Sequence, residues 1–269
     1  MLAPASDSLD AAVEAAREVL ARITHVTDLV VLHTTNNVVV GAGEFVAKVT
    51  TDSGVALREY LLAGEASTLG APAFAPVAAP ATSGRFTVVV WPRGSAARGA
   101  SPRDRAAALR SVHSAWLGSA VLLPTLSSRL DETRRLLCAG ELDRVLDQRS
   151  SAALIEVISD GIDLVGDDRA IIHGEPHDGN FVLHGSRLMI VDFEAACLGP
   201  IEWDLAFFPD DVIIEMWPDA DHELLGHCRT LVSATVSTYC WRHLAARGED
   251  VEMRSHAQSH LLNAIGHLL

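Results

Sequence analysis

Residues 171–200, with the sequence IIHGEPHDGNFVLHGSRLMIVDFEAACLGP, contain the side chains of this chain whose types and spacing are best suited to chemistry. Histidines, carboxylates and an asparagine surround two short apolar runs, FVL and RLMIV. The runs flank Gly185 and Ser186, and glycine at the first central position favours a type II′ hairpin turn. That turn predicts the cross-strand pairs Phe181–Ile190 and Leu183–Leu188. The segment is compatible with a metal site, a catalytic loop or a polar turn between strands.

Asn180 and Asp192 lie on diagonal positions at the open end of this predicted hairpin. Diagonal neighbours in an antiparallel pair are about 7–8 Å apart at the backbone, which is close enough for both side chains to hold one ion. An amide oxygen and a carboxylate suit Mg²⁺, which keeps waters and borrows phosphate oxygens, and they do not suit zinc. Glu175 precedes Pro176, which favours extended or turn backbone. Its carboxylate is placed to accept a proton from a hydroxyl; the alternative is a polar loop without function.

The elements that must position this segment are β-rich before residue 92 and α-rich after residue 101. Short β-rich runs predict a three-stranded meander over residues 28–50, in which GAGE is a turn rather than a phosphate loop because no long helix follows it. The apolar spacing predicts a strand over 85–91 and helices over 6–23, 55–69, 101–117, 126–148 and 222–269. The stretch PRGSAARGAS is the predicted boundary between two lobes, residues 1–91 and residues 92–269.

HGEPHDGN followed by VDFE resembles the HGDxxxxN and DF(G/E) motifs of the aminoglycoside phosphotransferase and choline kinase-like family, which are small-molecule relatives of protein kinases. GPIEWDLA, FVAKV, LREYLLAGEASTLGAPAFAP and LRSVHSAW are similar to further segments of that family. The resemblance covers roughly residues 28–208. It implies a bilobal, protein-kinase-like α+β fold, with a small antiparallel β-sheet in the N-lobe and a mainly helical C-lobe.

The resemblance also implies residue roles. Lys48 would reach the phosphates of ATP or GTP and form an ion pair with Glu59, for which Glu65 is the rival. The turn TTNN, with Asn37, would cover the phosphates, and backbone groups from Val90 and Trp91 onward would face the purine. Asn180 and Asp192 would bind Mg²⁺, Glu175 would take the position of the catalytic base, and His173 and Asp204 would brace the loop. These are the expected catalytic, nucleotide-binding and metal-binding residues.

Three positions depart from the family pattern. Glu175 stands where aspartate is commoner, and its extra methylene moves the carboxylate by about 1.5 Å. A misplacement of about 1 Å can lower a rate by about 10²-fold, but the base in phosphoryl transfer mainly positions the nucleophile. The turn TTNN lacks glycine, although asparagine tolerates the left-handed conformation. DFE replaces DFG, which places Glu194 near the metal, as in choline kinase-like members.

The charge balance points to a cationic small-molecule substrate. The chain carries 21 basic and 35 acidic side chains, a net charge of −14, which repels nucleic acid and acidic membranes and attracts cations. The segment 207–223 is rich in acid, and a solvated acidic loop is an equally good interpretation of it. The predicted substrate-binding residues are Asp178, Glu194, Asp210 and Asp211. The first-choice acceptor is an aminoglycoside or related antibiotic; a choline, amino-alcohol or sugar kinase and an impaired pseudokinase are the alternatives.

The remaining features bound the class of protein. The four cysteines form no CxxC pair, and a buried thiol is the default interpretation of Cys197. His256, His260 and His267 share a helical face, but solvated helix histidines are commoner than a metal site, so a metal-dependent hydrolase is a third rival only. No basic-then-apolar N-terminal segment and no apolar run of about 20 residues occurs, so we expect a cytoplasmic protein that does not span a membrane. The oligomeric state stays open.

Overall fold

The computed structural model describes residues 6–25, 28–34, 37–166 and 170–266. The chain folds into two compact units. The first contains residues 1–122 and 175–196, and the second contains residues 123–174 and 197–269. The functional lobes expected from the sequence, 1–91 and 92–269, are a different kind of division and stay a prediction.

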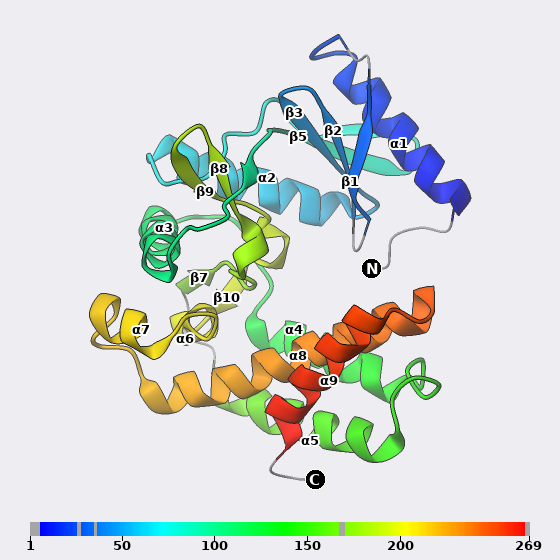
Figure 1. Ribbon diagram of the computed structural model, residues 1–269. Helices are drawn as coiled ribbons and strands as arrows, with labels where there is room; N and C mark the ends of the chain where they lie inside the picture. Colours follow the sequence, from blue (N-terminus) through cyan, green and yellow to red (C-terminus); the bar gives the residue numbers. More distant parts are fainter. Residues whose placement is uncertain (1–5, 26–27, 35–36, 167–169, 267–269) are drawn as a thin grey trace. The chain divides into compact units, whose positions relative to one another are not determined.

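The first unit is built on a five-stranded antiparallel sheet with the strand order β1-β2-β3-β5-β4 (Figure 1). Its strands are β1 (Val30–His33), β2 (Val38–Ala42), β3 (Phe45–Thr50), β4 (Ala81–Ser83) and β5 (Phe86–Pro92). The meander predicted over residues 28–50 is confirmed, and Gly43 and Glu44 of GAGE form the turn between β2 and β3. The sheet therefore carries its β3 strand in the middle, paired on both sides.

Helices pack on both faces of this sheet. Helix α1 (Ser6–Leu20) packs on β2, β3 and β5 (Figure 1), and buried alanines of α1 meet Ala47 and Val49. Because successive side chains of a strand point to opposite faces, Lys48 faces away from α1. That opposite face is the one on which α2 (Ser53–Thr68) lies, since its Glu59 contacts Lys48. Alternation along one strand thus separates the apolar core from a polar site.

Within residues 171–200, strands β8 (Phe181–His184) and β9 (Arg187–Ile190) form the expected hairpin. Strand β6 (Ser95–Ala96) pairs with β8, and helix α3 (Pro102–Ala115) packs against β9. Both predicted pairs, Phe181–Ile190 and Leu183–Leu188, are present. Gly185 has φ +60°, whereas Asp192 is the one non-glycine residue with positive φ among those described. Ser186 therefore keeps a negative φ, as a type II′ turn requires.

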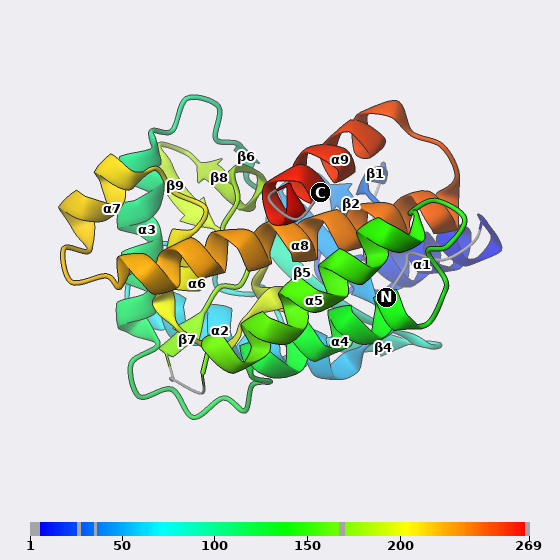
Figure 2. The same cartoon turned by 90° about the horizontal axis from the view of Figure 1, so that it is seen from below.

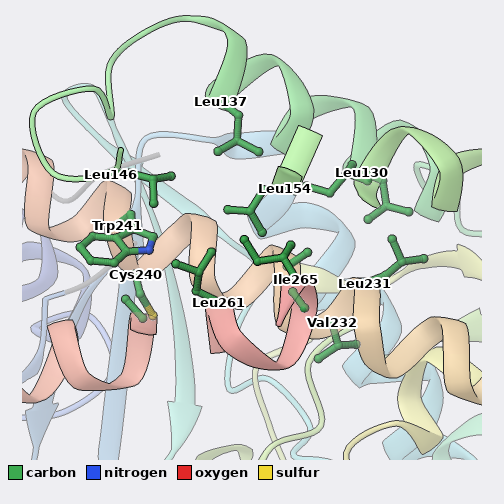
Figure 3. Packing of buried hydrophobic residues seen from close by; sticks show 14 of the residues in the cluster. Leu130, Leu137, Leu146, Leu154, Leu231, Val232, Cys240, Trp241, Leu261 and Ile265 are labelled. Atoms are coloured by element: carbon green, nitrogen blue, oxygen red, sulfur yellow. The ribbon is translucent and has the colours of Figure 1, made fainter. Parts of the chain in front are cut away.

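The second unit is mainly helical. Its helices are α4 (Leu126–Cys138), α5 (Gln148–Leu164), α6 (Ile201–Leu205), α7 (Asp210–Met216), α8 (His222–Arg247) and α9 (Val251–Ile265). Helix α8 packs against α5, α6 and α9, as Figure 2 shows for the long central helix. Figure 3 shows the core between them, where Leu154 of α5, Leu231 of α8 and Ile265 of α9 converge. The short strands β7 (Ala170–Ile172) and β10 (Cys197–Gly199) pair antiparallel at its edge.

Two of the helices expected from the sequence are interrupted. The run 126–148 ends as helix at Cys138, before Gly140 with φ +73°, and the run 222–269 breaks at Gly248 with φ +90°. Glycine adopts these left-handed values without a Cβ clash and so ends helices. The predicted α+β class, with a small antiparallel sheet and a mainly helical part, is confirmed with these corrections. No helix of the described residues is long and apolar enough to cross a membrane.

Candidate active site

Lys48 is the centre of the candidate site in the first unit. Its Nζ lies 3.0 Å from Glu59 Oε2, 2.6 Å from Asp192 Oδ1 and 2.9 Å from Glu194 Oε2. The lysine side chain is only 10% exposed. A buried ammonium needs such partners because burying an unpaired charge is costly. Three carboxylates from two segments, α2 and residues 192–194, therefore meet at one cation.

Each carboxylate is placed by a local feature of the backbone. Asp52 lies two residues after β3 and caps α2, because its carboxylate accepts a hydrogen bond from Val55 N–H at 3.0 Å. The helix therefore begins at a point from which Glu59 reaches Lys48. Asp192 has φ +69° and ψ +66°, a left-handed conformation that aspartate tolerates better than most residues. The 3₁₀ turn η2 (Phe193–Ala195) then presents Glu194. Such backbone outliers cluster at functional sites.

The electrostatics of the cluster are dominated by burial and by its excess of acid. Burial lowers the pKa of Lys48, but Asp192, Glu59 and Glu194 outweigh it and raise that pKa well above its ordinary value. Burial raises the pKa of Glu59 to about 7; Asp192 and Glu194 add to this rise, and Lys48 opposes it. Three carboxylates around one ammonium leave uncompensated negative charge, which the binding of a cation would offset.

Asn180 is linked to the Lys48 cluster by a backbone hydrogen bond to Val191, the residue before Asp192. It ends the 3₁₀ turn η1 (Asp178–Asn180), is buried, and donates from Nδ2 to the carbonyl of Glu175 at 2.8 Å. The N–H of Val191, next to Asp192, donates to the Asn180 carbonyl at 2.9 Å. The two expected Mg²⁺ ligands thus stand at the same end of the hairpin. Since the amide nitrogen is engaged, the amide oxygen is the atom of Asn180 suited to a cation.

These residues fit a magnesium ion better than a zinc ion. The donors at the hairpin end are an amide oxygen and carboxylates, which hard cations prefer, and Mg²⁺ usually takes few protein ligands beside water and phosphate oxygens. Across the part of the chain that the structure describes, no three or more His, Cys, Asp or Glu residues are grouped so as to hold a metal. The rings of His256 and His260 meet edge to face with centroids 4.6 Å apart, and His267 lies outside the described residues.

The expected nucleotide-binding residues are placed unequally. Asn37 is buried and its Nδ2 donates to Glu194 Oε2, so it joins the Lys48 cluster. The side chain of Val90 belongs to the apolar core under α1, and its carbonyl accepts a hydrogen bond from Val77 N–H at 2.9 Å. Trp91, on the face of Lys48, is half-buried. Thr35 and Asn36 of the TTNN turn lie outside the described residues.

The rival partner of Lys48 is engaged elsewhere. Glu65 accepts a hydrogen bond from Ser119 Oγ at 2.5 Å, whereas Glu59 contacts the lysine. Glu194 contacts both Lys48 and Asn37, and the sequence did not predict these two contacts. The DFE motif indicated only that Glu194 lies near a metal, and nothing local to either partner indicated the pairing.

His173 and Asp204 are both fully buried in the second unit. The carboxylate of Asp204 accepts hydrogen bonds from the backbone N–H groups of His173 at 2.7 Å and Gly174 at 2.8 Å. Trp203 Nε1 donates to the carbonyl of Gly174 at 2.7 Å. The WD pair of GPIEWDLA thus holds the backbone of the residues that lead directly into Glu175, whose side chain is half-buried.

The expected substrate-binding carboxylates do not form one group. Asp178 forms an ion pair with Arg105 in the first unit. In the second unit Asp210 lies 2.6 Å from Arg229, and Asp211 is exposed beside it at the start of α7. An arginine neutralises each of two of these carboxylates, so fewer charges are left for a cation than the sequence suggested. Cys197 is buried, as its default interpretation expected.

A sequence model described as "Phosphotransferase enzyme family" matches residues 33–227. None of the curated protein sequences compared with the chain matches it significantly.

Solved structures share the fold. An amicoumacin kinase in complex with AMP-PNP, Ca²⁺ and Ami has a TM-score of 0.73 at 12% identity, with 93% of each chain covered. The choline kinase LicA from Streptococcus pneumoniae has a TM-score of 0.66 at 15% identity, covering 94% of this chain and 98% of that one. A spectinomycin phosphotransferase in complex with ADP and spectinomycin has a TM-score of 0.62 at 14% identity, covering 92% and 96%.

Proposed function

Because this chain belongs to the phosphotransferase enzyme family, whose model matches residues 33–227, we propose that it moves the γ-phosphate of ATP or GTP to a hydroxyl group of a small, amine-bearing molecule. An aminoglycoside or related antibiotic is the acceptor class proposed first. We assign the reaction to the cytoplasm, where both nucleotides are abundant; this location stays a prediction.

The observation that carries the proposal is the convergence of Glu59, Asp192 and Glu194 on Lys48 Nζ. A lysine held by a helix carboxylate is the group that contacts nucleotide phosphates in kinase-like enzymes. The site has an ammonium for the phosphates and surplus carboxylate for the metal that accompanies them. Both halves of a metal–nucleotide complex therefore meet complementary charge in this unit.

Asn180 and Asp192 are the residues proposed to hold Mg²⁺. The bound ion would neutralise charge on the β- and γ-phosphate oxygens. Lys48 would orient the phosphates, and Glu59 would keep Lys48 in place. Glu175 would accept the hydroxyl proton of the acceptor and aim its oxygen at the γ-phosphorus. Asp204 would keep the backbone before Glu175 fixed through its two hydrogen bonds, and His173 would help to brace it.

The choice of acceptor rests on charge and on fold relatives. A net charge of −14 favours the approach of a polyamine-like antibiotic over that of an acidic substrate. Spectinomycin and amicoumacin enzymes of the same fold show that this architecture serves antibiotics. Asp178 and Glu194 in the first unit, and Asp210 and Asp211 in the second, stay the proposed amine-binding residues, although Arg105 and Arg229 offset two of them.

The test is a panel of amine-bearing antibiotics and amino alcohols incubated with Mg·ATP or Mg·GTP, with phosphorylated products read by mass spectrometry. The proposal expects one phosphate added to an antibiotic, and no product from Asp192→Ala. Asp163→Ala, which removes an exposed carboxylate of α5, is the control and should act as the wild type. Transfer to no member of the panel by any version would contradict the proposal.

A choline or amino-alcohol kinase is the second candidate. The choline kinase LicA shares the fold over nearly its full length, and Glu194 stands in a DFE motif similar to that of choline kinase-like members. Product formed from choline or ethanolamine alone, with all antibiotics left unmodified, would favour this candidate. A sugar kinase would be recognised in the same way by adding neutral amino-free sugars to the panel.

A nucleotide-binding pseudokinase is the third candidate, favoured by the glutamate at the base position. Glu175→Asp restores the commoner side chain. Turnover that appears only in Glu175→Asp would identify the natural chain as impaired, whereas turnover in the wild type excludes this candidate. Nucleotide binding by the wild type and by Glu175→Asp is also measured by calorimetry, so that a loss of turnover can be separated from a loss of binding.

A further inference from the structure

Trp116 stands at the C-terminal end of α3 and makes a directed contact with α2. Its indole Nε1 donates a hydrogen bond to the carbonyl of Leu62 at 3.0 Å. Trp116 is 3% exposed and Leu62 is fully buried. A buried indole N–H needs an acceptor, because leaving a donor unpaired away from water is unfavourable. The contact therefore selects one carbonyl in the interior of α2.

The same indole packs against the residue that follows Asp192. The rings of Trp116 and Phe193 have centroids 5.2 Å apart at an interplanar angle of 79°, an edge-to-face arrangement. Phe193 is 3% exposed, so this contact is part of a packed interior. The backbone at Asp192 is left-handed, a conformation that neighbouring contacts must maintain. Trp116 supplies one of those contacts.

One side chain therefore touches both segments whose carboxylates meet at Lys48. Leu62 lies three residues after Glu59, which is about one helical turn, and Phe193 is bonded to Asp192. The two carboxylates lie 3.0 and 2.6 Å from Lys48 Nζ. Since neighbouring carbonyls along a helix differ by about 1.5 Å in height, a hydrogen bond to one of them fixes how far α2 is shifted along its axis.

We propose that Trp116 is a positioning residue that sets α2 and the DFE segment so that Glu59 and Asp192 meet at Lys48. The inference rests on the proposed function, because it names what keeps the proposed nucleotide site assembled. Loss of the indole N–H leaves α2 free to shift while the apolar packing largely remains. A shift of about 1 Å at a reactive site can lower activity by about 10²-fold.

The experiment compares Trp116→Phe with Trp241→Phe. Trp241 is also 3% exposed, but its Nε1 has no hydrogen-bond partner within the described ranges, so its replacement by phenylalanine removes volume without removing a hydrogen bond and keeps an aromatic ring under Arg254. Affinity for Mg·AMP-PNP is measured by calorimetry, and the melting temperature is measured for each variant. We expect Trp116→Phe to weaken binding by about 10-fold or more, and Trp241→Phe to bind as the wild type at a similar loss of melting temperature.

A second pair of variants tests whether the effect passes through Glu59. In a Glu59→Gln background, adding Trp116→Phe should cause no further loss of affinity, because the group that Trp116 positions is already altered. Phe193→Leu, which keeps an apolar side chain but removes the ring contact, should act in the same direction as Trp116→Phe and serves if that variant does not fold. Additive losses overturn the inference, as does binding of Trp116→Phe or Phe193→Leu within about twofold of the wild type.

The outcomes separate this inference from the proposed function. A wild-type chain that binds Mg·AMP-PNP and phosphorylates none of the acceptors contradicts the proposed function, while the binding comparison still tests Trp116. Phosphotransfer by the wild type, together with unchanged binding by Trp116→Phe, contradicts the role of Trp116 alone. A wild-type chain that binds no nucleotide overturns both.

Discussion

Lys48 Nζ lies 2.6 Å from Asp192 Oδ1, although 144 residues separate the two in the sequence. The ammonium also holds Glu59, so a single buried cation joins β3, α2 and the turn after β9. The stability of this unit and its proposed nucleotide site consequently depend on the same side chain.

Lys48→Met should destabilise the chain strongly. Removing one partner of a buried pair costs about 3–5 kcal/mol, because the remaining carboxylates are left without a cation. The double variant Lys48→Met/Glu59→Gln should be more stable than Lys48→Met, since one buried charge is gone. Urea unfolding at neutral pH measures the free energies. Arg17→Met, which breaks an exposed pair with Glu14, should cost at most about 1 kcal/mol, and an equal cost for Lys48→Met would contradict the prediction.

The stability of the chain should depend on pH through Glu59. The pKa of Glu59 is raised from 4.5 to about 7 by burial, so the folded chain binds this proton more tightly than the unfolded chain does. The resulting stabilisation is fully present below pH 4.5 and is lost as the pH rises to about 7. The stabilisation linked to the raised pKa of Lys48 is fully present below that residue's ordinary value of 10.5, so it adds no pH dependence to the range from 4.5 to about 7.

Glu59→Gln removes this titration. The free energy of unfolding of the wild type should therefore fall more steeply than that of Glu59→Gln between pH 4.5 and about 7, and the two curves should run parallel above that range. Urea unfolding at half-unit pH steps, with both chains in one buffer series, measures the difference. Parallel curves across the whole range would show that Glu59 titrates normally.

Cysteine reactivity should report the packing of the second unit. Cys138 is exposed, whereas Cys197, Cys228 and Cys240 are buried. Burial, with Glu202, Asp204 and Asp221 nearby, raises the pKa of the Cys228 thiol to about 12, so little reactive thiolate is present at neutral pH. A colorimetric thiol reagent should label one cysteine quickly in the native chain and all four after unfolding. Cys138→Ser should abolish the fast phase; a fast phase that survives this change would contradict the packing.

Two helix glycines should respond in opposite ways to alanine. A Cβ on Gly161 of α5 would lie 2.2 Å from Leu231 Cδ2 of α8, whereas a Cβ on Gly226 of α8 would meet nothing within 4 Å. Gly161→Ala should destabilise the chain by about 1–3 kcal/mol through overpacking. Gly226→Ala should stabilise it by about 0.5–1 kcal/mol, because alanine is the better helix former. Thermal and urea unfolding measure both, and a gain of stability for Gly161→Ala would refute the close α5–α8 packing.

The local features of the fold could be predicted because their signals are local. The register of the β8–β9 hairpin follows from Gly185 at the turn and from the alternation of FVL and RLMIV. The meander of β1, β2 and β3 follows from short β-rich runs with a glycine-containing turn. Asn180 and Asp192, in the family motifs, flank this hairpin, so their position at its same end followed from the same register.

Glycine shows where local signals stop. Gly140 and Gly248 end helices with positive φ, but Gly161 and Gly226 stay inside helices. The residue type is the same at all four positions. Packing accounts for Gly161, which lies in α5 where Leu231 leaves no space for a side chain, whereas a Cβ on Gly226 would meet nothing within 4 Å. The sequence therefore predicted the helical regions but not their interruptions.

By itself, the sequence determined the family, the α+β class and the segment that carries the candidate chemistry. Only the tertiary structure decided that Glu59 rather than Glu65 meets Lys48, that Glu194 joins Asn37 across 157 residues, and that Trp116 reaches Leu62. Periodicity and turn chemistry act over a few residues, and they indicate on which face of its own helix or strand a side chain lies. Which distant side chain shares that face depends on how helices and strands pack, and that is an outcome of the whole folded chain.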